Sequence, residues 1–162
     1  MDTAAAEDSR PAFFIDMSGR QFIGTVVIGL GAGILTWGLA FVLEQYVLKG
    51  MFCQTMMTEQ CAAVPNYARG VAAVVATAAA VFALVKLQVF RPLLVGLGAI
   101  ISLWGVGATL AALPTGVEAA LYAGAFAVAY TAFTWIARLR SFWIAAVLMI
   151  LLIVAVRVVL NS

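Results

Sequence analysis

The sequence contains no histidine and only two cysteines in 162 residues. Histidine is the commonest side chain that ligates transition metals, and it is the commonest general base near neutral pH. Two cysteines cannot form a closed four-ligand metal site by themselves. The composition therefore predicts no resident metal or cofactor, and it argues against a metalloenzyme or a haem protein that supplies all its own axial ligands.

Charged residues are scarce as well. They make up 10% of the chain, whereas 65% of the residues are hydrophobic; ordinary globular proteins carry about 25% charged residues. The net charge of +2 comes from scattered side chains, so the clustered basic face of a nucleic-acid-binding protein is missing. Lipid is therefore the predicted environment of most of the surface, and nucleic acid is not an expected partner.

Five apolar stretches follow a polar amino-terminal segment. The hydrocarbon core is about 30 Å thick, so a spanning helix needs about 20 apolar residues, and helices are expected because an open strand edge is not stable in lipid. The sequence predicts an all-α, polytopic transmembrane bundle over residues 21–162, after a partly disordered cytoplasmic tail over residues 1–20. A four-span chain with one half-inserted stretch is the main alternative. The predicted spans cover residues 22–46, 68–87, 93–113, 117–137 and 142–160.

The distribution of basic residues predicts the orientation, because cytoplasmic loops are enriched in Lys and Arg. If the five spans alternate in direction, one side of the membrane receives Arg10, Arg20, Lys86, Arg91, Arg138 and Arg140. The other side receives Lys49, Arg69 and Arg157. The chain is therefore expected to have its amino terminus in the cytoplasm and its carboxyl terminus outside. Its richness in alanine and valine suggests a bacterial inner (cytoplasmic) membrane.

Cys53 and Cys61 both lie in a predicted external loop over residues 49–67. Disulfides persist on the oxidising side of a membrane, and closing so small a ring contributes about 2.5 kcal/mol in the chain-entropy model. A structural disulfide is therefore expected. A redox-active pair is the alternative, but small membrane thiol–disulfide oxidoreductases normally combine a Cys-x-x-Cys motif with a second cysteine pair, and this sequence has neither. Free thiols or intermolecular pairing complete the alternatives.

Small residues at four-residue spacing predict where helix backbones approach closely. The pairs of this kind are Gly29 with Gly33, Gly98 with Ser102, and Ala120 with Gly124. The last stretch has almost no small residues after Ala146. We therefore expect the first four helices to pack together and the fifth to be peripheral and to face lipid.

Ionisable residues within a membrane are costly and often mark function. Glu44 lies about one turn below the outer end of the first predicted span, at a depth similar to those of Arg69 and Arg157. One interpretation is an interfacial ion pair between Glu44 and one of these arginines. The other is a gate or a solute contact at an outward-facing mouth.

The sequence contains no nucleotide-binding loop, dinucleotide fingerprint or nucleophile constellation. The leading hypothesis is a non-enzymatic scaffold or an accessory subunit of a membrane complex, whose partners would be other membrane subunits or further copies of the chain. The second hypothesis is an oligomeric small-solute channel or transporter. The third is a membrane thiol–disulfide oxidoreductase.

Overall fold

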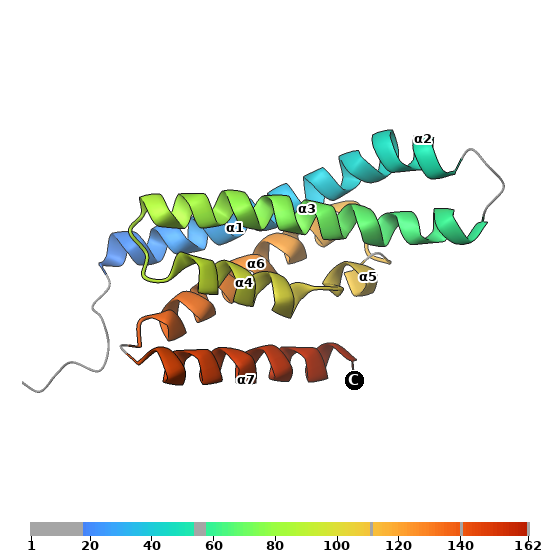
Figure 1. The fold of residues 1–162 in the computed structure, drawn as a ribbon. Coiled ribbons are helices and arrows are strands. Elements are labelled where there is room, and N and C mark those ends of the chain that lie inside the picture. Colours follow the sequence, from blue (N-terminus) through green and yellow to red (C-terminus); the bar gives the residue numbers. More distant parts are fainter. Residues whose placement is uncertain (1–17, 54–57, 111, 140, 162) are drawn as a thin grey trace, which may run out of the picture.

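A computed structural model describes residues 18–53, 58–110, 112–139 and 141–161, and it confirms that the chain is all-α (Figure 1). The predicted tail lies outside the described residues except for its last three, of which Gly19 and Arg20 begin the first helix. The elements are α1 (Gly19–Val42), the π-helical segment η1 (Leu43–Leu48), α2 (Lys49–Phe52), α3 (Thr58–Lys86), α4 (Pro92–Leu103), α5 (Val106–Leu110), α6 (Thr115–Ala137) and α7 (Phe142–Asn161).

Within the described residues, four helical runs are long and apolar enough to cross a membrane, which makes the chain a multi-pass membrane protein. These runs are Gly19–Phe52, Cys61–Lys86, Thr115–Ala137 and Phe142–Val159. The expected third span is not one uninterrupted helix, because α4 ends at Leu103 and α5 begins only at Val106. Gly105 has a φ of +92°, which the right-handed helix excludes and which glycine adopts at little cost.

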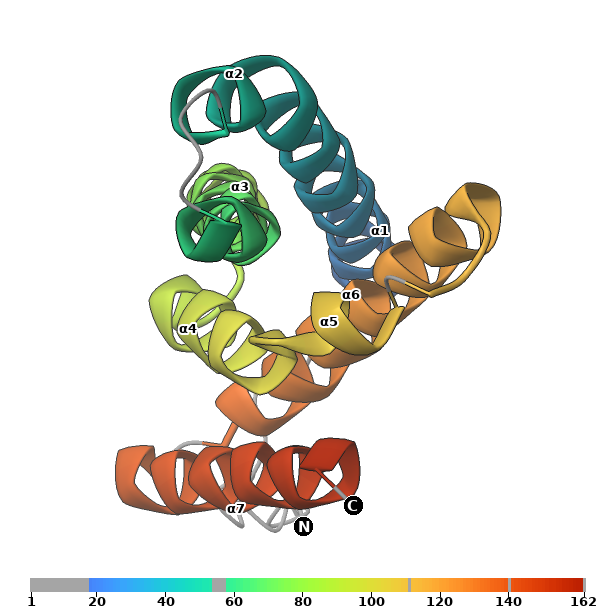
Figure 2. The ribbon, with the colours of Figure 1, turned by 90° about the vertical axis from the view of Figure 1, so that its right-hand side faces the viewer.

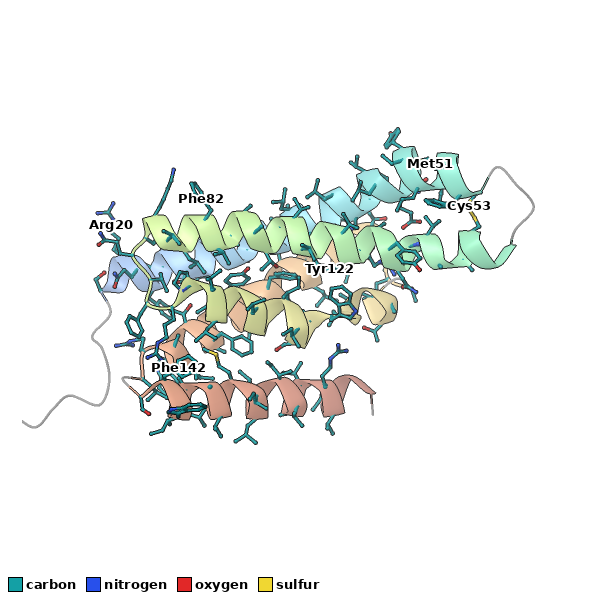
Figure 3. The ribbon with its side chains drawn as sticks, in the orientation of Figure 1. Arg20, Met51, Cys53, Phe82, Tyr122 and Phe142 are labelled. Carbon is teal, nitrogen blue, oxygen red and sulfur yellow. A yellow bond between two sulfur atoms is a disulfide. The ribbon has the colours of Figure 1, made fainter. Side chains whose placement is uncertain are left out.

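Successive stretches run in alternate directions between the same two ends of the bundle (Figures 1 and 2). The α1–α2 run leads away from Gly19, α3 returns, α4 and α5 together lead away again, α6 returns, and α7 leads away. Figure 3 places Arg20, Phe82 and Phe142 at one end and Cys53 at the opposite end. We call these the Arg20 end and the Cys53 end.

The expected external loop over residues 49–67 is largely helical. The first helical run continues through η1 and α2 to Phe52, and α3 begins at Thr58 with Pro65 inside it. The run Gly19–Phe52 has 34 residues and is therefore about 51 Å long, compared with a hydrocarbon core of about 30 Å. This run is therefore longer than the hydrocarbon core is thick, and α3, with 29 residues, is longer as well.

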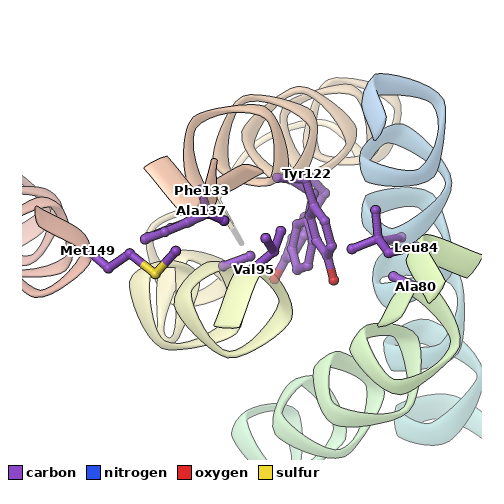
Figure 4. Close-up of a cluster of buried hydrophobic side chains, with 11 residues drawn as sticks. Ala80, Leu84, Val95, Tyr122, Phe133, Ala137 and Met149 are labelled. Carbon is purple, nitrogen blue, oxygen red and sulfur yellow. The ribbon is translucent and has the colours of Figure 1, made fainter. Parts of the chain in front are cut away.

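The buried core lies between α1, α3, α4 and α6, where Leu84, Val95, Tyr130 and Phe133 are almost fully buried (Figure 4). Helix α7 contacts α4 and α6 and contributes Met149 to this cluster. Only 11% of its spanning segment is buried, against 28%, 33% and 33% of the other three. The prediction of a peripheral last helix is confirmed.

Candidate functional site: a cavity beside an interrupted helix

The interruption between α4 and α5 leaves backbone groups without helical partners. Trp104 is extended, with φ −61° and ψ 120°. Its carbonyl oxygen accepts a hydrogen bond of 2.7 Å from Nη1 of Arg157 on α7. Because an unpaired backbone group in hydrocarbon costs several kcal/mol, this bond stabilises the interruption. Arg157 therefore caps a broken helix, and it does not pair with Glu44 as one expectation had it.

A cavity of ≈ 370 Å³ lies beside this interruption, between α1, α3, α4, α5 and α6. Its polar lining includes Asn66, Arg69 and Tyr122, and its apolar lining includes Trp104 and Phe126. Measured along their helices from the Arg20 end, Phe126 lies about 16 Å in and Arg69 about 26 Å in. The cavity thus occupies the half of the bundle nearer the Cys53 end and reaches toward its middle.

Gly107 on α5 packs closely against this lining. A Cβ atom added at Gly107 would collide with the hydroxyl of Tyr122 and would lie 2.5 Å from Cδ of Arg69. Tyr122 in turn stacks on Phe126, with ring centroids 6.4 Å apart, and Phe126 stacks on Tyr130 at the same distance. The short helix therefore rests directly on the arginine and on the end of an aromatic ladder along α6.

A smaller pocket of ≈ 60 Å³ adjoins the cavity. Arg69 and Tyr122 line both spaces, and the smaller pocket is also lined by Glu44 and Glu118. Arg69 and Tyr122 thus form the boundary between the cavity and a pocket that carries two carboxylates.

Glu44 forms an ion pair with Lys49, with 3.0 Å between Oε1 and Nζ. This corrects the expected pairing of Glu44 with Arg69 or Arg157. The physical reason is the π-helical turn of η1, whose i→i+5 periodicity places residue 49 beside residue 44. Glu44 and Arg69 still share the small pocket, without an ion pair between them in the described part of the chain.

Two further polar side chains, Thr77 on α3 and Tyr130 on α6, lie one helical turn beyond residues that line the cavity. Ala73 and Phe126 line the cavity; Thr77 and Tyr130 follow them by four residues and are buried. Within the described ranges, neither hydroxyl has a hydrogen-bond partner, although the two lie near each other. By contrast, the hydroxyl of Thr36, in the cavity wall, donates to the Ala32 carbonyl at 2.8 Å.

The predicted packing residues of α1 meet α6 at backbone contact. A Cβ atom at Gly29 would lie 2.7 Å from Cα of Ala127, and one at Gly33 would lie 2.6 Å from Cα of Ala123. We call these four residues the α1–α6 seam. Only glycine permits this approach, and the seam fixes the position of Tyr122 because that residue precedes Ala123.

The other predicted packing residues differ in their surroundings. Gly98 lies against the ring of Phe133, and Ser102 is buried and donates to the Gly98 carbonyl at 2.7 Å. Ala120 and Gly124 do not make the expected close contact, since a Cβ atom at Gly124 would have no neighbour within 4 Å. They line an open apolar groove of ≈ 420 Å³ between α6 and α7, which we call the α6–α7 groove.

The expected disulfide is present. It joins Cys53, after α2, to Cys61 in α3, with Cα atoms 5.1 Å apart. Figure 3 places Cys53 at the end of the first helical run, whereas Tyr122 lies within the bundle. The disulfide therefore ties two helices together, and neither cysteine lines the cavity.

No cluster of three or more His, Cys, Asp or Glu residues suited to a metal ion occurs in the part of the chain that the structure describes. No protein-family model, curated protein or solved structure matches the chain. The site therefore has to be interpreted from its own geometry.

Sequence reasoning missed the interruption and, with it, the cavity. The signal was present as two glycines around one valine, Gly105-Val106-Gly107, inside an apolar stretch. A hydrophobic segment interrupted by glycine is a pointer to a binding site in membrane transporters. The predicted span over residues 93–113 runs through Gly105 without a break.

Proposed function

We propose that this chain is a non-enzymatic membrane protein that binds a small polar solute from the outer side and acts as the subunit of a carrier. The observation that carries the proposal is the cavity at the α4–α5 interruption. Irregular backbone at membrane depth is tolerated only where protein buries it or where it lines a water-filled cavity. Discontinuous helices of this kind form the substrate sites of many transporters.

The proposed topology has five crossings, with the Arg20 end in the cytoplasm and the Cys53 end outside, in a bacterial inner membrane. The alternating directions of the five stretches support the crossing number (Figure 1). The four described basic residues of the Arg20 end support the orientation through the positive-inside rule; they are Arg20, Lys86, Arg91 and Arg138. With this topology the cavity is in the outer half of the bilayer.

An accessory or scaffold subunit is the second candidate, and the α6–α7 groove supports it. Its lining is almost wholly apolar, and its small residues, Ala120 and Gly124, leave room for a helix of another subunit or another copy of the chain. The thiol–disulfide oxidoreductase is a weaker third candidate, because neither cysteine lines the cavity.

The first test asks whether water fills the cavity. Ala73→Cys places a thiol in the cavity wall, and Val75→Cys places one on an exposed face of the same helix that would contact lipid. A membrane-impermeant maleimide added to intact cells should label Ala73→Cys and leave Val75→Cys unlabelled, because thiolates form in water and not in hydrocarbon.

The second part of the test measures transport. The purified chain in liposomes should exchange at least one member of a panel of radiolabelled organic acids, amino acids and sugars. A dry cavity would refute the carrier proposal. Absence of exchange, together with a partner that co-purifies in fixed ratio, would favour the accessory subunit.

A further inference from the structure

We propose that the solute is a small organic anion and that Arg69 is the group that recognises it. This inference rests on the proposed function and adds the chemical class of the ligand. It follows from the charge inside the cavity, from the surroundings of Arg69, and from the placement of the neighbouring carboxylates.

The first observation is the charge of the lining. Of the described residues around the cavity, Arg69 alone is charged. It is half-buried, and the ion pair in the described ranges joins Glu44 to Lys49 and leaves Arg69 out. A guanidinium is always protonated, and a partly buried charge is costly unless it meets an anion or water. An anion in the cavity would supply that partner.

The second observation is the chemistry around the guanidinium. Its planar fork binds carboxylates and phosphates through two parallel hydrogen bonds. The Asn66 amide and the Tyr122 hydroxyl add polar groups, while Trp104 and Phe126 offer apolar surface to the rest of the ligand. A cavity of ≈ 370 Å³ is at the small end of the range for small-molecule sites. The lining thus fits an oxyanion on a compact organic body.

The third observation is the competition for Arg69. Glu118 lines the small pocket together with Arg69, and Glu44, in the same pocket, is already neutralised by Lys49. A bound anion must therefore hold the guanidinium on the cavity side against the pull of Glu118. Removing the charge of Glu118 should strengthen anion binding, whereas removing the charge of Arg69 should abolish it.

The experiment compares matched anionic and neutral probes on the full chain in nanodiscs of phosphatidylcholine. Benzoate and succinate are titrated against benzamide and succinamide, and orthophosphate is a further arm. We expect a carboxylate to bind in preference to its amide. Arg69→Gln should weaken carboxylate binding at least about tenfold, which corresponds to about 1.4 kcal/mol, and Arg69→Lys should give an intermediate loss because it keeps the charge without the fork.

Two further variants guard against a simple loss of folding. Glu118→Gln should tighten carboxylate binding several-fold, a gain that a destabilised protein would not give. Arg20→Gln removes the same charge at the opposite end of the bundle and should leave binding unchanged. Equal binding of acid and amide to the wild type, or an unchanged preference in Arg69→Gln, would overturn the inference.

The carrier proposal can survive that outcome, because labelling of Ala73→Cys measures water in the cavity and does not depend on the charge of the ligand. A lipid headgroup is the competing source of the same oxyanion chemistry. If phosphatidylglycerol still abolishes carboxylate binding to the wild type at high salt, where the surface charge of the bilayer is screened, the cavity binds a lipid headgroup and the inference of a small solute is refuted. If carboxylate binding is equal in both lipids, the solute is confirmed as the ligand.

Discussion

The α1–α6 seam and the α6–α7 groove use the same kind of sequence in opposite ways. Gly29 and Gly33 are spaced four residues apart, as are Ala120 and Gly124. At the seam, an added Cβ atom would fall 2.7 Å or less from the backbone of α6, whereas at Gly124 it would meet nothing within 4 Å. One spacing joins two backbones, and the other leaves an open surface.

The difference comes from the partner helix. Toward the seam α6 presents Ala123 and Ala127, so both surfaces are small and the backbones can meet. Toward the groove α7 presents larger side chains, including Leu152 and Val156, which hold the two helices apart. Small residues on one helix thus permit a close approach, and small residues on the other decide whether it happens.

The largest expected effect comes from filling the seam. Gly33→Leu should destabilise the bundle by about 3 kcal/mol or more, since its side chain has to displace the α6 backbone. Gly124→Leu is the matched control and should change stability by less than about 0.5 kcal/mol. Thermal unfolding in detergent measures both variants, and equal destabilisation would mean that the seam and the groove are not different in solution.

A smaller effect is expected from removing the disulfide between Cys53 and Cys61. Replacing Cys53 and Cys61 together with Ser should lower the free energy of unfolding by about 2.5 kcal/mol in the chain-entropy model, as measured by denaturant titration. The wild type under reductant should match the double variant. Loss of transport with unchanged stability would instead identify the pair as redox-active.

The smallest effect is expected at helix α7, on the side of the α6–α7 groove. Arg157→Ala removes the hydrogen bond between α7 and the Trp104 carbonyl and should cost about 1–2 kcal/mol. Hydrogen exchange should rise around Trp104 and stay unchanged at Gly33, and Arg157→Gln, which keeps a donor, should recover part of the protection. An equal rise in hydrogen exchange at Trp104 and at Gly33 would show that loss of this bond destabilises the whole bundle and not only the contact of α7.

Much of the fold could be predicted because bilayer thickness fixes helix length. The stretches 117–137 and 142–160 agree with α6 and α7 to within two residues at each end. Local capping was less predictable. Thr115 begins α6, but its N-cap is Pro114, without a side-chain hydrogen bond, whereas Ser18 and Gln21 form a capping box at the start of α1.

The candidate site could be predicted only in fragments. Arg69 and Glu44 stood out as charges in apolar surroundings, but their neighbours were decided by tertiary structure. The π-helical turn brought Lys49 to Glu44, and the placement of α5 brought Gly107 to Arg69. Neither contact follows from the regular spacing of residues that can be recognised in a single sequence. The role of Arg157 could not be predicted either, because the Trp104 carbonyl that it binds is unpaired only as a result of the helix interruption.

The disulfide also limits how the cavity can open. Sliding α3 past α1 by one helical turn, about 5.4 Å, would pull the Cα atoms of Cys53 and Cys61 from 5.1 Å to beyond the span that a disulfide bridges, about 4.4–6.8 Å. The disulfide therefore prevents α3 from sliding along α1 by a full turn at this end of the bundle. In the proposed carrier, the wall that is left to move is the opposite one, where Gly105 interrupts the helix.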